Sequence, residues 1–347
     1  MRAKGKISFS SPSNIAIVKY WGKEPGDQIP MNASLSMTLD KCRSFTSVEY
    51  EIGAGVDASV EVWFEGSRSV EIEAKLQRWF TKISYFYSWL GQSRLRIESH
   101  NNFPHSAGIA SSASGMSALA MCLWGIDRRV RQDEGQPLEV CSNVARLGSG
   151  SASRSVTGPW VVWGKTEAFP EASNEFAMPV QGIDKGFHNL NDTIIVVDKA
   201  PKSISSREGH ALMDGHPWRE GRIHQAEQNM DLLKKALLFG NWKDFEWVTE
   251  NEALSLHALM LASQGGVMLW KGDTVEWMHY LRQKRAQLGT SMAFTLDAGA
   301  NIHLLYPDSQ KQEVLKLLEQ SPVSCIELIH DHAGFGPEKL TDEYESL

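Results

Sequence analysis

A stretch in the first third of the chain, residues 101–115, has a composition that suits anion binding. It is rich in Pro, Gly and Ser and has no bulky side chain after Ile109, and good helix formers follow from Met116. Small residues let backbone N–H groups approach an anion, and a helix N-terminus adds the positive end of its dipole. The stretch therefore predicts a phosphate-type loop, with an ordinary helix N-cap as the open alternative.

Two lysines near the N-terminus could also bind an anion. They are Lys19 and Lys23, which follow Asn14 in a mostly apolar segment and enclose two aromatic residues and a glycine. Their ammonium groups could reach a phosphate or a carboxylate, but solvated lysines at a strand end would give the same pattern.

Two further loops contain a charged group. A glycine- and serine-rich loop contains Ser149, Ser151 and Arg154. Guanidinium binds carboxylate and phosphate through paired hydrogen bonds, so this loop suits an anionic ligand, although a flexible turn has a similar composition. Asp297 occupies a tight Leu-Asp-Ala-Gly turn, where it could act as a general base, bind a metal or cap the turn.

Hydrophobic patterns predict the elements that must position these loops. The first half of the chain alternates in a way that favours an antiparallel, β-rich opening. An apolar helix face runs over 75–90, and 128–136 is a polar surface connection. The remaining predicted strands lie at 7–10, 35–39, 47–52, 60–64, 94–98 and 156–164, and the remaining helices at 116–124 and 140–146.

The second half of the chain has an α+β pattern. A β-branched apolar run over 191–198 predicts a buried strand, and 293–306 predicts two strands joined by a tight turn. Helices are predicted at 223–237, 242–261, 274–288 and 314–318, and a last strand at 323–329. This order favours a second domain with an antiparallel sheet. We place the boundary just before it, which gives domains 1–189 and 190–347.

Composition limits the classes of partner. The chain has 347 residues, 42% of them hydrophobic, and a formal net charge of −7, so no global basic field favours nucleic acid. A phosphorylated substrate would need a local basic site. The four cysteines are widely separated and form no CxxC pair, which favours reduced thiols in a cytoplasmic protein. No stretch has the apolar length of a signal peptide or a membrane span.

The four loops together resemble one family. The motifs are Asn14 to Lys23, Asn101 to Gly115, Gly150 to Ser155 and Thr295 to Asn301, and they occur in the family's order. The chain is similar to the mevalonate diphosphate decarboxylases of the GHMP kinase superfamily. The loop at 101–115 alone indicates only the superfamily, whereas the first motif and the Ser-Ala-x-Arg-Ser motif are specific to the decarboxylase branch.

The resemblance implies an α+β fold with a ribosomal-protein-S5-like N-terminal domain, a ferredoxin-like C-terminal domain and an active site between them. It implies that ATP, with Mg²⁺, phosphorylates the 3-hydroxyl of mevalonate 5-diphosphate. Loss of that phosphate and of CO2 would give isopentenyl diphosphate. A cytoplasmic homodimer is implied as well.

The resemblance also assigns roles to residues. Asp297 would handle the proton of the 3-hydroxyl, Arg154 would hold the carboxylate within a network that includes Asn14, and Lys19 would stabilise the departing phosphate. The implied substrate-binding residues are Tyr20, Lys23, Ser149 and Ser151. The implied ATP-binding residues are Pro104, Ala107, Gly108, Ala110, Ser111, Ser112 and Ser114, with Ser112 also a candidate metal ligand.

The sequence departs from the family pattern at His105, Ser153 and Ala300, none of which removes a charged group. Two alternatives stay open. One is a decarboxylase or 3-kinase that acts on mevalonate 5-phosphate or mevalonate, and the other is a non-catalytic binding protein with this fold. Residues 330–332, His-Asp-His, have metal-ligand spacing, but we interpret them as the structural end of the last strand.

Overall fold

A large antiparallel sheet forms the first half of the molecule in this computed structural model, which describes residues 3–104, 109–132, 135–200 and 203–346. Its strands follow the order β14-β1-β4-β7-β5-β6, and β8 and β9 extend it from β4. The bounds are β1 (Ala3–Val18), β4 (Ser34–Ile52), β5 (Ser59–Phe64), β6 (Ser67–Arg68), β7 (Ser93–Asn101), β8 (Trp160–Trp163), β9 (Ala177–Pro179) and β14 (Glu338–Ser346). Only β5 and β7 pair in parallel among these described strands.

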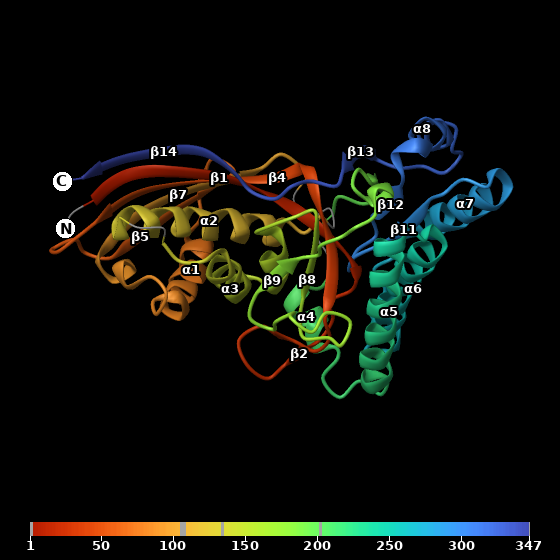
Figure 1. Cartoon of the computed structure of the whole chain (residues 1–347), viewed down its shortest axis with the longest axis horizontal. Helices are drawn as coiled ribbons and strands as arrows, with labels where there is room; N and C mark the ends of the chain where they lie inside the picture. Colours follow the sequence, from red (N-terminus) through yellow and green to blue (C-terminus); the bar gives the residue numbers. More distant parts are fainter. Residues whose placement is uncertain (1–2, 105–108, 133–134, 201–202, 347) are drawn as a thin grey trace.

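The strand alternation seen in the sequence decides which face of this sheet is covered. Leu95 and Ile97 of β7 are buried, whereas Arg94 and Arg96 between and beside them are exposed. The buried face packs against three helices, which Figure 1 shows along one side of the sheet. They are α1 (Val70–Ile83), α2 (Ser111–Arg131) and α3 (Leu138–Gly148).

Several predicted boundaries in this half are wrong. The helix expected at 75–90 begins at Val70, capped by Ser69, and ends at Ile83; a short 3-10 turn, η1 (Ser88–Gln92), continues the apolar spacing. The helix expected to end at 124 continues to Arg131, so its last turn replaces part of the predicted connection. Apolar spacing alone does not show where helical hydrogen bonding stops.

The strands predicted at 35–39 and 47–52 are one continuous strand, β4, with an irregularity opposite Pro12 and Asn14. Asp331 explains how the chain crosses the polar segment between them. Its carboxylate accepts the backbone N–H groups of Asp40, Lys41 and Cys42 at 3.0, 2.8 and 2.7 Å. A side chain that is almost 300 positions away therefore satisfies the bulge, which no local pattern could predict.

A second, four-stranded antiparallel sheet with the order β11-β12-β10-β13 forms the other half. Its strands are β10 (Asn191–Val196), β11 (Ala293–Thr295), β12 (Ile302–Tyr306) and β13 (Glu327–His332). Its helices are α4 (Ser206–Ala211), α5 (Arg219–Phe239), α6 (Trp242–Ala262), α7 (Gly272–Leu288) and α8 (Lys311–Glu319). The predicted α+β order is confirmed, although α4 was missed, the strand expected at 323–329 lies at 327–332, and it is not the last strand, because β14 follows it.

The chain then returns to the first sheet. β14 pairs with β1 from Ser10 opposite Glu338 to Ala3 opposite Ser346, so both ends of the chain lie at the same end of the sheet in Figure 1. The division at 189 and 190 stays a prediction. Within the described residues, none of the helices combines the length and the apolar character that crossing a bilayer requires.

Candidate active site

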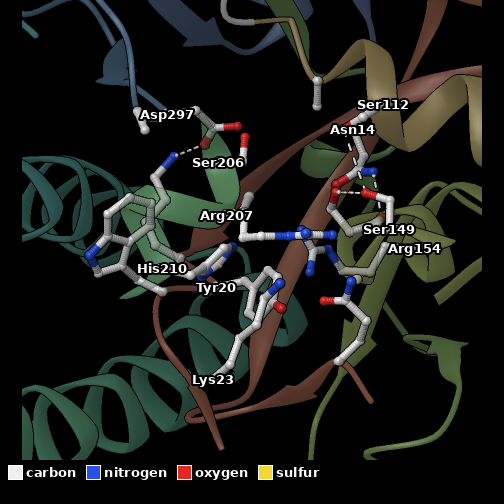
Figure 2. A pocket seen from close by; sticks show the side chains of 18 of the residues that line it. Asn14, Tyr20, Lys23, Ser112, Ser149, Arg154, Ser206, Arg207, His210 and Asp297 are labelled. Carbon is white, nitrogen blue, oxygen red and sulfur yellow. Dashed lines mark hydrogen bonds and ion pairs between the residues drawn. The ribbon is translucent and has the colours of Figure 1, made fainter. Parts of the chain in front are cut away.

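A polar cavity of about 240 Å³ lies where the end of β1, the start of α2, the 148–154 segment, α4 and the turn after β11 meet (Figure 2). The sequence-predicted residues that line it are Asn14, Lys19, Tyr20, Lys23, Ala110, Ser112, Ser149, Ser151, Arg154 and Asp297. Residues from four separated segments, from β1 of the first sheet to the turn after β11 of the second, therefore converge on one space.

Lys19 and Asp297 form an ion pair across the cavity. The lysine Nζ lies 2.9 Å from Asp297 Oδ1, and the side chains are 2% and 27% exposed, respectively. Burial lowers the pKa of Lys19, while the carboxylate of Asp297 acts in the opposite direction. The pair joins the end of β1 in the first sheet to the turn after β11 in the second.

Arg154 is fixed by hydroxyl groups of β4. It belongs to a 3-10 turn, η2 (Gly150–Ser155), and it donates from Nε to Ser36 Oγ at 3.1 Å and from Nη1 to Ser34 Oγ at 2.7 Å. Burial lowers the pKa of Arg154 to about 10, so the group stays cationic at neutral pH. Its orientation is set before any ligand arrives.

Asn14 is tied to the same turn. Its Nδ2 donates to Ser151 O at 3.2 Å and to Ser155 Oγ at 2.8 Å. Its Oδ1 is buried and has no hydrogen-bond partner among the described residues, although the side chain lines the cavity. The two bonds of Nδ2 fix the Asn14 side chain against the 150–155 turn.

Aromatic contacts position Tyr20. Its ring packs 4.7 Å from that of Trp163 and 4.2 Å from that of His210, and its buried hydroxyl lacks a described partner. Gly150 permits this approach, since a Cβ at that position would lie 2.8 Å from the Tyr20 hydroxyl. Lys23 lies in a short hairpin strand, β2 (Lys23–Glu24), which pairs with β3 (Ile29–Pro30). Burial and the positive charges of Arg207 and Lys82 lower the pKa of Lys23.

The serine hydroxyls form a looser group. Ser112 Oγ, in the first turn of α2, lies 3.5 Å from Ser149 Oγ, which lies 3.5 Å from Ser151 Oγ. Ser114 points elsewhere: its hydroxyl is buried 2.7 Å from Ser44 Oγ and donates to Ser111 O. Pro104 and Ser111 are not among the cavity-lining residues. Ala107 and Gly108, with His105, lie outside the described residues.

One wall of the cavity consists of residues that the sequence did not predict. α4 contributes Ser206, Arg207 and His210. His210 Nδ1 accepts the Gly22 N–H at 3.0 Å, and burial, with Lys23 and Arg154, lowers the His210 pKa to about 3. The ring is therefore a neutral acceptor that holds the segment after β1. The Ser-x-x-Glu capping box that begins α4, Ser205 with Glu208, was a readable signal for this helix.

The His-Asp-His run has a structural role. Asp331 holds β4, and His330 Nδ1 lies 3.0 Å from Thr193 Oγ1. Across the described parts of the chain, no three His, Cys, Asp or Glu side chains are grouped so that they could hold a metal ion.

Two family models match the chain. The diphosphomevalonate decarboxylase-like N-terminal domain matches residues 11–175, and the mevalonate 5-diphosphate decarboxylase C-terminal domain matches residues 193–338. The diphosphomevalonate decarboxylase of Saccharomyces cerevisiae is 30% identical over 321 residues, which cover 86% of this chain and 77% of the relative.

Comparison with solved structures agrees with the two family models. The mevalonate diphosphate decarboxylase from Staphylococcus aureus has a TM-score of 0.83 at 26% identity and covers 98% of this chain and 99% of its own. A structure of MDDEF in complex with MVAPP, AMPPCP and magnesium has a TM-score of 0.82 at 26% identity, with 99% and 100% covered. With nearly the whole chain matched in sequence and in fold, the protein belongs to the diphosphomevalonate decarboxylase family.

Proposed function

We propose that the protein catalyses the ATP-dependent decarboxylation of mevalonate 5-diphosphate to isopentenyl diphosphate, ADP, phosphate and CO2. The observation that supports this most strongly is the Lys19–Asp297 pair in one cavity with Arg154. A phosphoryl-transfer base, a cation for a leaving phosphate and a carboxylate-binding guanidinium are the three groups that this reaction requires.

The charge of the cavity suits the substrate. The described lining residues include four basic side chains but one carboxylate, that of Asp297. The basic residues are Lys19, Lys23, Arg154 and Arg207. Mevalonate 5-diphosphate is a polyanion with a carboxylate at one end and a diphosphate at the other. Arg154 would bind the carboxylate bidentately.

The diphosphate has its own set of partners in this proposal. The hydroxyls of Ser149, Ser151 and Tyr20 would donate to its oxygens, and the ammonium of Lys23 would neutralise part of its charge. Arg207 adds a second guanidinium to the same cavity. Asn14 would support the carboxylate end through its bonds to Ser151 and Ser155.

The start of α2 suits the phosphates of ATP. Ala110 and Ser112 line the cavity there, and the first N–H groups of a helix have no carbonyl partner within it. The loop before it, with Pro104, Ala107 and Gly108, is proposed to complete the ATP site together with Ser111. Ser114 would only support the first turn of α2 from beneath, because its hydroxyl is engaged by Ser44 and Ser111. Mg²⁺ prefers oxygen ligands and often binds through phosphates, so the hydroxyl of Ser112 fits it. Bound there, the ion would neutralise charge on the transferring phosphoryl group.

The chemistry follows from the ion pair. Asp297 accepts the proton of the 3-hydroxyl while that oxygen attacks the γ-phosphorus of ATP in line, and ADP leaves. The C3–O bond then breaks, and its electrons leave with the phosphate. The C1–C2 bond breaks to release CO2, and its electron pair becomes the C2=C3 double bond. Lys19 stabilises the negative charge on the departing phosphate, while Arg154 keeps the carboxylate in place.

Product ratios test the proposal. Purified protein is incubated with ATP and Mg²⁺ and with mevalonate 5-diphosphate, mevalonate 5-phosphate or mevalonate, and ADP and CO2 are both measured. We expect one CO2 for each ADP with the diphosphate and much slower turnover with the other two. ADP without CO2 would identify a 3-kinase, and nucleotide binding without turnover would identify a binding protein.

We also propose that the protein works in the cytoplasm as a homodimer of chains with domains 1–189 and 190–347. The cysteines Cys42, Cys122, Cys141 and Cys325 are all unpaired, which suits a reducing compartment. Sedimentation equilibrium of the purified protein measures the oligomeric state directly, and a monomer mass at micromolar concentration would contradict the homodimer.

A further inference from the structure

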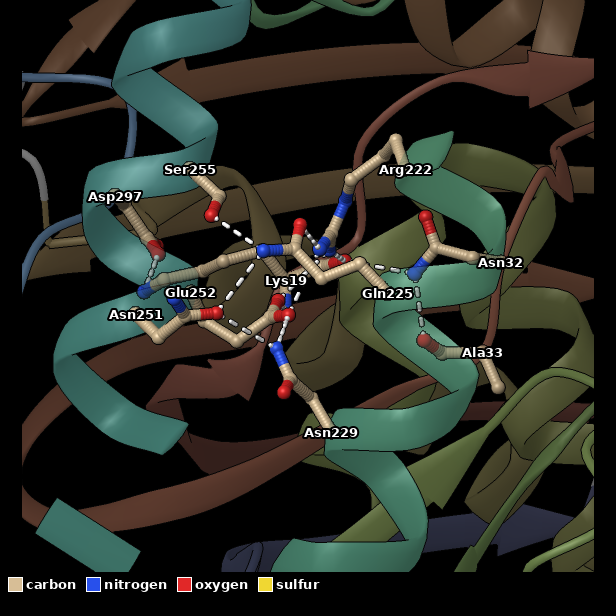
Figure 3. A network of polar contacts seen from close by, with 10 residues as sticks. All are labelled: Lys19, Asn32, Ala33, Arg222, Gln225, Asn229, Asn251, Glu252, Ser255 and Asp297. Atoms are coloured by element: carbon tan, nitrogen blue, oxygen red, sulfur yellow. Dashed lines mark hydrogen bonds and ion pairs between the residues drawn. The ribbon is translucent and has the colours of Figure 1, made fainter. Parts of the chain in front are cut away.

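The backbone of Lys19 is held by side chains rather than by a strand. β1 ends at Val18, and Lys19 is buried, so both of its backbone polar groups need partners. Its N–H donates to Glu252 Oε2 at 2.8 Å. Its carbonyl accepts from Arg222 Nη2 at 3.1 Å and from Asn32 Nδ2 at 2.9 Å (Figure 3). Helices α5 and α6 therefore fix the position of a residue that directly follows a strand of the first sheet.

Glu252, on α6, is completely buried and uses its carboxylate fully. Arg222 donates to both oxygens at 2.7 Å, Asn229 donates to Oε1 at 2.6 Å, and Lys19 donates its N–H to Oε2. These four donors match the acceptor capacity of a carboxylate. Buried ion pairs can often be replaced by apolar residues without loss of stability. Stability alone therefore does not explain why Glu252 and Arg222 form a buried pair here.

The same helix reaches the other member of the catalytic pair. His257, five residues after Glu252 on α6, has its Nε2 3.0 Å from the backbone oxygen of Asp297. A carbonyl only accepts hydrogen bonds, so this nitrogen is the donor. The ring of His257 is itself stacked 4.8 Å from that of Trp270. α6 thus binds the backbone of both residues whose side chains form the Lys19–Asp297 pair.

We propose that Glu252 and His257 are positioning residues, which make α6 the common reference for Lys19 and Asp297. Lys19 follows a strand of the first sheet and Asp297 a strand of the second, and α6 contacts both strands. Without a shared support, the separation of the two side chains would vary with the placement of one sheet relative to the other. The inference rests on the proposed function, in which this pair performs the chemistry.

The charge of Glu252 gives the proposal a distinct signature. The charged groups around the Lys19 side chain are Asp297 and Glu252, which raise its pKa, and Arg154, which lowers it, and Arg222 bonds to the Lys19 carbonyl. In Glu252→Gln, one negative charge is lost and Arg222 is left without its counter-ion. Both changes lower the pKa of Lys19. Because Lys19 acts as a cation in the proposed reaction, its deprotonation ends turnover, so the alkaline limb of the kcat profile moves to lower pH.

A matched pair of substitutions on α6 tests this. Glu250, two residues earlier, is also buried and ion-paired, with Arg282 at 2.8 Å and with Arg285, on α7. We expect Glu252→Gln to lower kcat by about 100-fold with KM for mevalonate 5-diphosphate nearly unchanged, because a displacement of about 1 Å can cost that much. Glu250→Gln is expected to lower Tm by about as much as Glu252→Gln does. It should leave kcat and the alkaline limb of the kcat profile unchanged.

A second pair keeps the test decisive where Glu252→Gln does not fold. His257→Gln retains a donor for the Asp297 carbonyl, whereas His257→Leu removes it. We expect the kcat of His257→Leu to be far below that of the wild type and the kcat of His257→Gln to be close to it. A wild-type protein without turnover of mevalonate 5-diphosphate would reject the proposed function itself. A fully active wild type, with Glu252→Gln kinetically equal to Glu250→Gln and His257→Leu equal to wild type, would overturn only the positioning role.

Discussion

The two ends of the cavity differ in how closely contacts within the chain hold their side chains. At the reacting end, Lys19 contacts Asp297 at 2.9 Å, and Arg154 is held by two serine hydroxyls at 2.7 and 3.1 Å. At the proposed phosphate end, the hydroxyl oxygens of Ser112, in the first turn of α2, and Ser149 are 3.5 Å apart. In the proposed reaction, fixed geometry is thus concentrated where bonds would change, while the phosphate oxygens would meet groups that are held less tightly.

The largest effect is expected from Asp297→Asn, which removes the base but keeps the shape of the side chain. We expect kcat to fall by about 10³-fold or more, with little change in the affinity for mevalonate 5-diphosphate. Single-turnover ADP formation measures the chemical step, and equilibrium binding measures the affinity. A near-normal single-turnover rate would show that Asp297 only anchors Lys19 and would remove the distinction between the two ends of the cavity.

Arg154→Lys is expected to have the next largest effect. An ammonium cannot donate to Ser34 and Ser36 and also bind a carboxylate through two parallel bonds, so kcat/KM should fall by about 100-fold. Arg128→Lys is a matched control, because both arginines lie over a tryptophan ring, Arg154 at 5.8 Å from that of Trp163 and Arg128 at 4.7 Å from that of Trp124, but Arg128 is not a cavity residue. Equal kinetics for the two variants would mean that the preformed contacts of Arg154 serve packing alone.

Residues at both ends of the cavity could be predicted from sequence. Lys19, Arg154 and Asp297 are charged residues in turns that follow apolar elements, and local pattern marks such positions. Resemblance to a family then related loops that are hundreds of positions apart. The order of helices and strands could also be predicted, because alternation and helical spacing are local properties of the sequence.

What could not be predicted depends on contacts between distant segments. Asp331 supports the bulge of β4, and Glu252 supports the backbone of Lys19 from 233 positions away. Neither contact has a local signature: the His-Asp-His run around Asp331 predicted only the end of a strand, and a glutamate within a helical segment does not show whether it is buried. The return of β14 to β1 is non-local in the same way. Arg207 is different: its helix had a capping signal, but no pattern linked that helix to the cavity.

At the phosphate end, Ser149→Ala is expected to raise KM for mevalonate 5-diphosphate by about tenfold with a small change in kcat, since one hydrogen bond to a charged group is lost. Steady-state kinetics with the diphosphate measure this directly. Ser84→Ala, at an exposed serine that bonds only locally to Thr81 O among the described contacts, should leave KM unchanged. A loss confined to kcat would mean that Ser149 belongs functionally to the reacting end.

The smallest kinetic effect is expected from Ser112→Ala, which should raise KM for ATP about two- to threefold because the helix N–H groups remain. Ser114→Ala makes the comparison sharper. The resemblance assigns Ser114 to ATP, but its hydroxyl is buried against Ser44, so its loss should cost about 1 kcal/mol of stability and leave KM for ATP unchanged. Thermal unfolding and ATP titrations of both variants separate the roles. If Ser114→Ala weakened ATP binding more than Ser112→Ala, the adjustable region would extend beneath the first turn of α2, and the two ends would differ less than the contacts indicate.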